Sequence, residues 1–387
     1  MPPPSPSSVR RRALLLAAGA AGSLASPWPL RAATLPRVLL FSPNSEGNTY
    51  WPQVFEILSN VAQALQFDFV PFSFGVGDRF VRQAEALRLI GQAPRPQAVI
   101  ADVVIGDAAR ELEAAEQAGV PLFLLGPLFP AELPALGGAP RLKYRRWAAL
   151  LQSDEEEKGY RLGGLLLDAA RQAQAFARDG RVHAVGLGGA RSWSGSQLRE
   201  AGFARAVTER PFALLHQVVP TRWSPAEGRH ITTRLLQRYP ESSVVWAASD
   251  QLGAGAAQAL QEAGRTLGRD AFTGGLDLSE LGLALVQQGR FVATVAASFA
   301  SWFELAVLVN DHVRGVDFAD ELGSAVSFPT LTATRENAAQ IQEVVRLLPS
   351  IDPRPFSKAA TPARRRYDFS QQAFASAVAG LRRRGPP

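Results

Sequence analysis

The sequence predicts an α/β fold with two similar Rossmann-like lobes. From Arg37 onward, short apolar runs alternate with amphipathic stretches of helical period. The apolar runs are continuous rather than alternating, which is typical of parallel strands covered by helices on both faces. The chain has 387 residues, and its candidate strands are too many for one compact sheet. We therefore expect two α/β domains.

The first lobe begins with a regular alternation of strands and helices. We predict strands at Val38–Phe41, Phe67–Phe72, Ala98–Ala101 and Pro121–Leu125, and helices at Trp51–Leu65, Arg79–Gly91 and Asp107–Ala118. The segment Gly126–Trp147 is rich in Pro and Gly, so we expect a long loop there.

The same alternation then resumes for the second lobe. We predict helices at Glu157–Arg178, Gln197–Val207, Pro225–Arg238, Leu252–Ala263, Leu278–Gln288 and Ser301–Arg314. The strands expected between them are Val182–Leu187, Phe212–Val219, Ser243–Ala247, Phe272–Gly275 and Phe291–Val295. Past Ile351 the chain is rich in Pro, Arg and Ala, which indicates an appended tail.

The positive charge is concentrated at the two ends of the chain. The net charge is +6, but residues 1–33 contribute +4 and residues 351–387 contribute +6, so the body between them carries −4. An acidic body is a poor partner for nucleic acid, and we expect no nucleic-acid partner.

The N-terminus has the pattern of an export signal. Arg10–Arg12 forms a basic region, and the apolar stretch Ala13–Ala25 is too short to span a bilayer. The pair of arginines also resembles a twin-arginine signal. A frayed terminus or a membrane anchor is the alternative. We expect residues 1–33 to be removed and the mature protein to lie in the periplasm. The absence of cysteine is compatible with such an oxidising compartment.

Motifs for catalysis, cofactors and metals are missing. The stretch "GLGGAR" places Arg191 where a dinucleotide fingerprint needs its third glycine, and there is no Walker loop, nucleophile elbow or HExxH pair. The acidic run 154–157 is interpreted as the cap of the following helix rather than a metal cluster. We therefore expect no enzyme activity, no catalytic residues, no cofactor and no metal.

Five short motifs carry a family resemblance when they are taken in order. The first strand leads into Ser42 and then Asn48-Thr49-Tyr50-Trp51, and the later matches are "REAGF" at 199–203, Trp223, "SDQLGAGA" at 249–256 and "GLD" at 275–277. In this order and spacing, the chain from about Arg37 to Val345 resembles the type I periplasmic binding proteins of sugar importers, the ribose-binding kind in particular.

That resemblance implies two lobes joined by three crossings, near Leu151, Ser298 and Gly323, with a ligand cleft between them. The implied organisation is a signal peptide at 1–33, an N-terminal lobe at 34–151 plus 299–323, a C-terminal lobe at 152–298 plus 324–349, and a basic tail at 350–387. The family's ligand positions fall on Ser42, Asn48, Tyr50, Trp51, Arg199, Trp223, Ser249, Asp250 and Asp277.

The chemistry of these residue types suits a sugar ring. Aromatic planes such as Tyr50, Trp51 and Trp223 can cover the apolar faces, while Asn48, Arg199 and Asp277 can hydrogen-bond the hydroxyl rim. For several of them a structural role is the alternative. Tyr50 or Trp51 could staple a helix start, Arg199 could pair with Glu200 or Glu209, Asp250 could cap its helix, and Trp193 could face either cleft or solvent.

Two positions depart from the family pattern. Gly126-Pro127 stands where an Asp-Arg pair is expected, and Ala297 lies near the place of an expected glutamine. Each lost charge-assisted contact is worth about 1.5–3 kcal/mol. A simple aldopentose is therefore expected to bind poorly in what remains. Either the long loop Gly126–Trp147 fills the gap, or the ligand is larger or less hydroxylated.

The resemblance implies a ligand-binding function with a membrane partner. The partner is an ABC permease, or alternatively the periplasmic domain of a sensor kinase, and the protein is expected to act as a monomer. A hydrolase on the same architecture would need a nucleophile–base pair that the sequence does not show. Regulators of the lactose-repressor type share the fold but begin with a DNA-binding helix-turn-helix, which an export signal replaces here.

Overall fold

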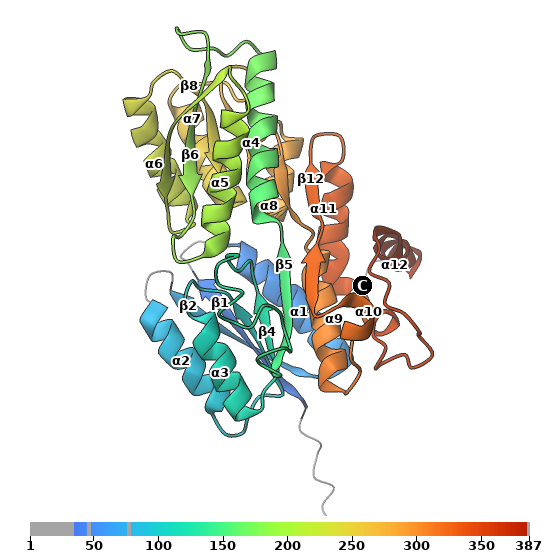
Figure 1. Cartoon of the computed structure of the whole chain (residues 1–387). Coiled ribbons are helices and arrows are strands. Elements are labelled where there is room, and N and C mark those ends of the chain that lie inside the picture. The colour runs from blue at the N-terminus through green and yellow to red at the C-terminus, as the bar shows by residue number, and fades with distance from the viewer. Residues whose placement is uncertain (1–34, 45–47, 76–78, 385–387) are drawn as a thin grey trace, which may run out of the picture. The chain divides into compact units, whose positions relative to one another are not determined.

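The computed structural model describes residues 35–44, 48–75 and 79–384. The predicted export signal lies outside the described residues. Within the described part, parallel strands form two separate sheets, each covered by helices, and this confirms the predicted α/β class (Figure 1).

The first sheet has six strands among the described residues, in the order β11-β5-β4-β3-β1-β2, and all its pairings are parallel. Its strands are β1 (Arg37–Asn44), β2 (Asp68–Gly75), β3 (Ala98–Asp102), β4 (Leu122–Leu125), β5 (Trp147–Ser153) and β11 (Ala325–Phe328). The sequence analysis predicted the first four strands and missed β5 and β11. The apolar run of β5 follows the long loop directly, without a turn signal to separate them.

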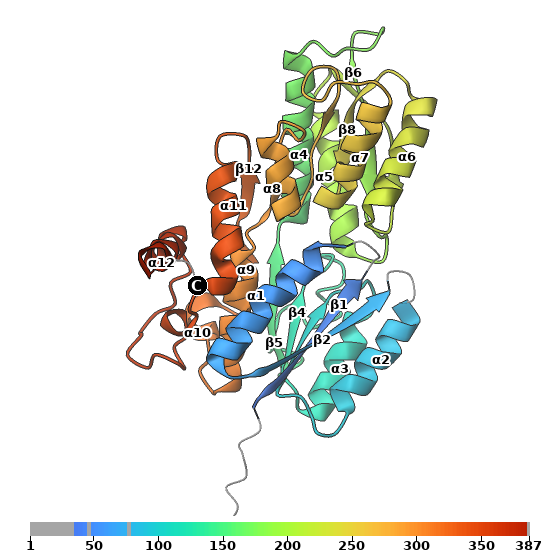
Figure 2. The same cartoon turned by 180° about the vertical axis from the view of Figure 1, so that it is seen from behind.

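Helices cover both faces of this sheet: α1 (Tyr50–Leu65), α2 (Arg79–Gly91), α3 (Ala108–Ala118) and α9 (Ala300–Val313) (Figure 2). Successive residues of a strand point to opposite faces. In β1, Val38 and Leu40 belong to the core formed with α1 and α9, whereas Leu39 and Phe41 belong to the core formed with α2 and α3. A continuous apolar strand is therefore needed here.

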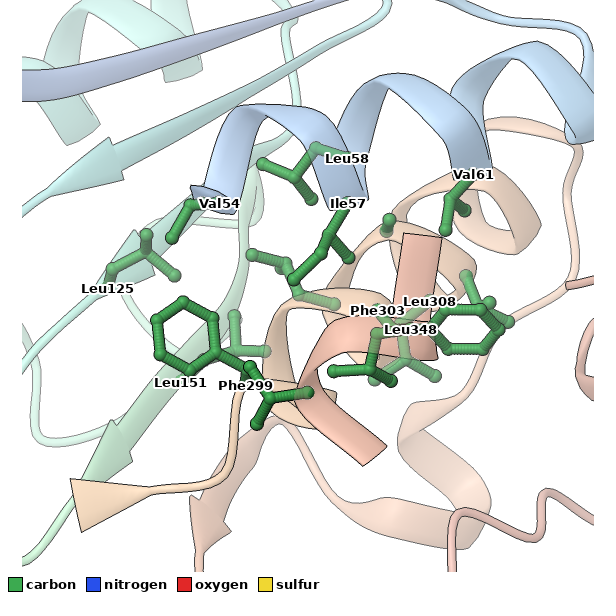
Figure 3. Close-up of a cluster of buried hydrophobic side chains, with 14 of the residues drawn as sticks. Val54, Ile57, Leu58, Val61, Leu125, Leu151, Phe299, Phe303, Leu308 and Leu348 are labelled. Carbon is green, nitrogen blue, oxygen red and sulfur yellow. The ribbon is translucent and has the colours of Figure 1, made fainter. Parts of the chain in front are cut away.

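Figure 3 shows how α1 packs in the first of these cores. Val54, Ile57, Leu58 and Val61 point from one face of α1 toward Phe303 and other buried side chains. Their spacing of three and four residues is the helical period that predicted this element. Gln66, in the left-handed conformation with φ of 59°, ends the helix.

The second sheet is also parallel, with the order β7-β6-β8-β9. Its strands are β6 (Val182–Gly188), β7 (Ala213–Pro220), β8 (Ser242–Ala247) and β9 (Phe272–Thr273). The helices that pack with it in one core are α4 (Glu155–Gln172), α5 (Ser194–Thr208), α6 (Pro225–Arg238) and α7 (Asp250–Glu262). Local capping fixes several of these starts; Ser224, for example, accepts a hydrogen bond from the N–H of Glu227, and Pro225 follows it.

The chain passes between the two lobes at three places in the described part. It leaves the first sheet after β5, returns to it at α9 after β10 (Thr294–Ala297), and leaves again between β11 and β12 (Thr330–Ala333), which pairs with β10. The third crossing therefore follows Phe328 and differs from the predicted position near Gly323. The reason is that β11 pairs with β5 inside the first sheet.

The C-terminal segment packs on the first lobe and is not a detached tail. Helix α11 (Ala338–Leu347) packs mainly on α8 (Glu280–Gln287), and the segment that follows it contains η1 (Leu348–Ser350), η2 (Arg354–Phe356) and α12 (Gln371–Arg384). The short α10 (Ala319–Leu322) lies earlier in the chain, between α9 and β11. Ile351, Phe356, Tyr367, Phe374 and Val378 are buried in the α1–α9 core. The prediction of an appended tail is therefore wrong; it rested on a composition rich in Pro, Arg and Ala, which does not reveal the buried aromatic residues.

Asp311 on α9 anchors this segment. Its carboxylate accepts hydrogen bonds from the Ser357 hydroxyl, from the N–H of Lys358 at 2.7 Å and from the Tyr367 hydroxyl at 3.0 Å. The ring of Phe374 meets that of Phe303 edge to face at 5.4 Å. The segment is thus an integral part of the first lobe's core.

We expect Phe374→Ala to lower the free energy of unfolding by about 3–5 kcal/mol, because it leaves a cavity in a packed core. Arg383→Ala, an exposed change on the same helix, is the matched control and should change stability by less than about 0.5 kcal/mol. Urea unfolding followed by circular dichroism measures both. Equal stability of the two variants would show that the segment is dispensable.

Candidate functional site

A cavity of about 290 Å³ lies where the carboxyl ends of strands from both lobes meet. Ligands of open α/β sheets bind at this edge. Seven of the nine positions expected to touch ligand line this cavity: Asn48, Tyr50, Trp51, Arg199, Trp223, Ser249 and Asp277.

The other two positions, Ser42 and Asp250, do not line the cavity, and both are fully buried. The Ser42 hydroxyl lies 3.3 Å from that of Ser73 on the neighbouring strand. The Asp250 carboxylate accepts hydrogen bonds from the Ser279 N–H and hydroxyl at 2.9 and 2.7 Å and from the Thr294 hydroxyl at 2.6 Å. Asp250 therefore joins three segments of the second lobe. The helix cap considered for it belongs instead to Ser249, whose hydroxyl accepts from the N–H of Leu252 at 3.2 Å.

Asn48 holds the two aromatic residues at the start of α1. Its Oδ1 accepts hydrogen bonds from the N–H groups of Tyr50 at 2.9 Å and Trp51 at 3.2 Å. Side-chain acceptors at this place satisfy donors that have no partner within the helix. The amide thus fixes the direction in which both rings enter the cavity.

A third aromatic residue from α9 completes this wall. The indole N–H of Trp302 donates to the Tyr50 hydroxyl at 3.1 Å, and its ring meets that of Trp51 at 5.5 Å and 64°. Burial raises the pKa of the Tyr50 hydroxyl, so it stays neutral. Trp51 is only 8% exposed and also belongs to the core. Sequence reasoning missed Trp302 because it lies in an apolar helix where a core role was the simplest reading.

The second lobe supplies an opposing aromatic pair. Trp223 adopts φ of 71°, and its backbone N–H donates to the Thr221 hydroxyl at 3.2 Å. Its ring meets that of Trp193 edge to face, with 6.0 Å between the ring centres. Its ring occupies space that a side chain at Gly189 would fill, since a Cβ there would lie 1.8 Å from the ring. The indole nitrogen of Trp193, another cavity residue, is buried without a hydrogen-bond partner among the described residues.

Arg199 lies at the charged centre of the cavity. Its Nε donates to Glu155 at 2.6 Å and its Nη1 to the carbonyl of Ala248 at 2.7 Å. Lys158 donates to the same Glu155 carboxylate at 2.5 Å and to the Ser153 hydroxyl at 2.6 Å. The expected alternative partners, Glu200 and Glu209, are therefore replaced by a buried residue of α4.

Close packing of α4 against α5 brings these charges together. A Cβ on Gly159 would lie 1.9 Å from the carbonyl oxygen of Arg199, and one on Gly202 would lie 1.9 Å from that of Glu156. The two backbones can approach this closely only because both positions are glycine. The sequence analysis interpreted the acidic run 154–157 as a helix cap. Asp154 does cap α4, accepting from the N–H of Glu157 at 2.8 Å, but Glu155 turns into the cavity.

The carboxyl groups of the cavity differ in their tendency to ionise. Burial alone would raise the pKa of Glu155, but the charges of Arg199 and Lys158 outweigh it and lower this pKa to about 2. Burial raises the pKa of Asp277 well above its usual value, and the neighbouring Asp250 raises it further. Burial also raises the pKa of Asp102 to about 7, against the opposing charge of Arg82.

A second buried charge cluster supports the first-lobe side of the cavity. Arg82, which lines the cavity, donates to Glu111 at 2.6 Å, to Asp107 at 3.1 Å and to the carbonyl of Asp102 at 2.7 Å. It thereby ties α2 and α3 to the end of β3. No local pattern indicated this cluster, because its members look like ordinary polar residues of surface helices.

This arrangement is suited to non-covalent binding. Aromatic rings from both lobes can cover the faces of a small ring, and the polar centre between them can hydrogen-bond its rim. Within the described residues, no group of three or more His, Cys, Asp or Glu side chains is placed to hold a metal ion. No helix in the described part is both long and apolar enough to cross a membrane.

We expect Glu155→Gln to destabilise the fold by about 3–5 kcal/mol, because it leaves Arg199 and Lys158 as poorly compensated buried charges. The lowered pKa also fixes the pH dependence. The contribution of the Glu155 carboxylate to the free energy of unfolding is complete above its ordinary pKa of 4.5, and it is lost as the pH falls toward the folded-state pKa of about 2. The stability difference between wild type and variant should therefore shrink over that interval.

Glu156→Gln is the matched control, since Glu156 is 39% exposed and pairs with Arg205 at the surface. Its effect should stay below about 1 kcal/mol at any pH. Urea unfolding of the three proteins between pH 7 and pH 2 provides the measurement. A pH-independent difference between wild type and Glu155→Gln would contradict the ionised state assigned to this carboxylate.

Comparison with known proteins agrees with this architecture. The chain is similar to the ribose import binding protein RbsB of Salmonella typhimurium, 30% identical over 112 residues that span 29% of this chain and 36% of the relative. It is also similar to a periplasmic sugar-binding protein from Pseudomonas fluorescens, with a TM-score of 0.74, 24% identity and coverage of 88% and 100% of the two chains.

A further similar structure is an ABC transporter periplasmic solute binding protein from Actinobacillus succinogenes, solved with bound D-allose. The TM-score is 0.65 at 19% identity, with 79% of this chain and 99% of the other covered. The family model described as "Periplasmic binding protein domain" matches residues 39–313. The expected resemblance is thereby confirmed, and the chain belongs to the periplasmic binding protein family, with the type I architecture of its sugar-type members.

Proposed function

We propose that this protein is an exported solute-binding protein that captures a small sugar-like ligand in the cavity and delivers it to an ABC permease. The observation that carries the proposal is the pairing of aromatic walls from two lobes around one polar centre. Tyr50, Trp51 and Trp302 come from the first lobe, and Trp193 and Trp223 from the second.

A sugar ring matches these walls in both shape and polarity. Its C–H faces are apolar and can stack on indole and phenol rings, while its hydroxyls need donors and acceptors at the rim. In this proposal Arg199 and Asp277, which line the cavity, would supply the rim contacts. The indole N–H of Trp193, which has no hydrogen-bond partner in the described part of the chain, would add a donor. The relatives named for ribose import and solved with D-allose support a monosaccharide-sized ligand.

Ligand capture would proceed by hinge closure about the three crossings. A ligand that touches both lobes gains its full contacts only when the lobes meet, so it selects the closed arrangement. Contacts that bridge the lobes at the cavity already exist in this structure. The Gln251 amide donates to the Thr49 hydroxyl at 2.9 Å, and the N–H of Ile105 donates to the carbonyl of Ser192 at 2.9 Å.

Export and delivery complete the proposal. Residues 1–33 would direct the chain to the periplasm, where the closed monomer would dock on a permease. A sensor kinase is the alternative recipient of the closed form. Deletion of the gene separates the two, since a transport protein is needed for ligand uptake and a sensor is needed for the transcriptional response.

We expect a ligand to lower the radius of gyration, with no product formed over hours. The first probes are D-ribose and D-allose, screened by thermal shift and followed by small-angle X-ray scattering on any sugar that binds. Trp223→Ala should weaken binding by about 1–3 kcal/mol, the scale of one lost aromatic face.

Tyr160→Ala is the control, because Tyr160 lies on α4 away from the cavity and donates its hydroxyl to Glu209. It should leave affinity unchanged. Trp51→Ala is a poorer test, since Trp51 is also a core residue. Tight binding without compaction would refute hinge closure, and chemical turnover of the sugar would refute a purely binding function.

A further inference from the structure

The charges of the cavity are confined to part of its surface. The acidic and basic lining residues come from α2, from the end of β3 and from the second lobe, at Arg82, Asp102, Glu155, Arg199 and Asp277 among others. The remaining side is built by the ends of β4, β5 and β11 and by α9. We call this side the hinge-side wall and define it by Leu125, Gly126, Leu151, Trp302, Leu305 and Phe328.

The hinge-side wall is continuous because its strands are neighbours. Leu125 of β4 stands opposite Leu151 of β5, and Phe328 of β11 stands opposite Ser153 at the end of β5. Figure 3 shows Leu125 and Leu151 within the buried cluster that also contains Val54 and Phe299. The wall is therefore the cavity-facing edge of the first lobe's hydrophobic core. Leu125, Leu151 and Leu305 are only 8%, 2% and 1% exposed, whereas Trp302 and Phe328 are half-buried.

Several polar atoms around this wall are already engaged within the protein. The Ser298 hydroxyl accepts from the N–H of Ala300 at 3.1 Å, the Ser153 hydroxyl accepts from Lys158, and the Tyr50 hydroxyl accepts from Trp302. Gln152 and Ser301 remain at its edge as neutral polar side chains. A hydroxyl group pressed against the apolar surface of Trp302, Phe328 and the leucines behind them would lose its water, and hydrocarbon side chains offer it no hydrogen-bond partner.

We infer that the ligand has an apolar edge that lies on the hinge-side wall, as in a deoxyhexose, and a hydroxylated edge that faces the charged centre. This inference rests on the proposed function and deepens it. Burying a hydroxyl without a hydrogen-bond partner is unfavourable, whereas burying a methyl group is favourable. The wall therefore selects for the sugar that lacks a hydroxyl at one end.

Matched sugar pairs test this directly by isothermal titration calorimetry. D-Fucose and D-galactose differ only in the hydroxyl at carbon 6, and the same holds for L-rhamnose and L-mannose. We expect the deoxy sugar of at least one pair to bind about tenfold to a hundredfold more tightly than its hydroxylated partner, the discrimination typical of an apolar pocket facing a single hydroxyl.

The outcomes separate this inference from the proposed function. If the hydroxylated partners bind as tightly as the deoxy sugars or more tightly, the apolar edge is refuted while sugar binding stands. If neither these four sugars nor D-ribose, D-allose and L-arabinose bind, the sugar-binding function itself fails, and the inference fails with it.

Two variants at one position give a second test. Ala297, at the end of β10, lines the cavity beside Ser298 and is half-buried. Ala297→Gln places an amide next to the hinge-side wall and should reduce the preference for the deoxy sugar to less than about threefold. Ala297→Leu adds similar bulk without an amide and should keep the preference. Loss of the preference in both variants, or in neither, would contradict the assigned wall.

Discussion

The buried ion pair between Arg199 and Glu155 is the interaction on which the cavity depends. Glu155 is the first residue of α4, directly after the crossing from β5, while Arg199 lies on α5. Both side chains are less than 10% exposed, so neither charge is stabilised by bulk water. Their pairing requires the close approach of α4 and α5 at Gly159 and Gly202. One contact thus joins a hinge crossing, the packing of the second lobe and the charge of the cavity.

The pair also explains why the aromatic walls can face each other across a polar centre. Arg199 lies 4.9 Å from the ring centre of Trp193, which in turn meets Trp223. A guanidinium held by Glu155 can stack on an indole while its remaining donors point to a ligand. In the first lobe, Asn48 performs the comparable task for Tyr50 and Trp51 through backbone hydrogen bonds. Each lobe therefore fixes its own rings before any ligand arrives.

The sequence predicted those parts of the site that depend on local signals. The turn at Asn48 and the pattern at Arg199 lie next to strands and helices whose periods are clear, and the family resemblance that these motifs carry implied the seven positions that line the cavity. Glu155 and Trp302 were missed, because a carboxylate in a helix's first turn and a tryptophan in an apolar helix have ordinary structural explanations. Strands β5 and β11 and the packed C-terminal segment were missed as well. Their places depend on pairings between distant residues, such as Tyr367 with Asp311, that no local pattern encodes.

The difference among the three carboxyl groups bears on what the cavity can hold. Glu155 is ionised because two cations lie within hydrogen-bond distance, whereas burial raises the pKa values of Asp102 and Asp277. Because the pKa of Asp102 is raised to about 7, this carboxyl group is partly protonated near neutral pH, and in that form it donates a hydrogen bond as well as accepting one. Sugar hydroxyls also donate and accept, so they can pair with either form. A cationic ligand would instead meet Arg199 and Lys158 at the centre, together with a Glu155 carboxylate that both cations already share. The electrostatics of the cavity therefore favour a neutral, hydroxyl-bearing ligand over a cationic one.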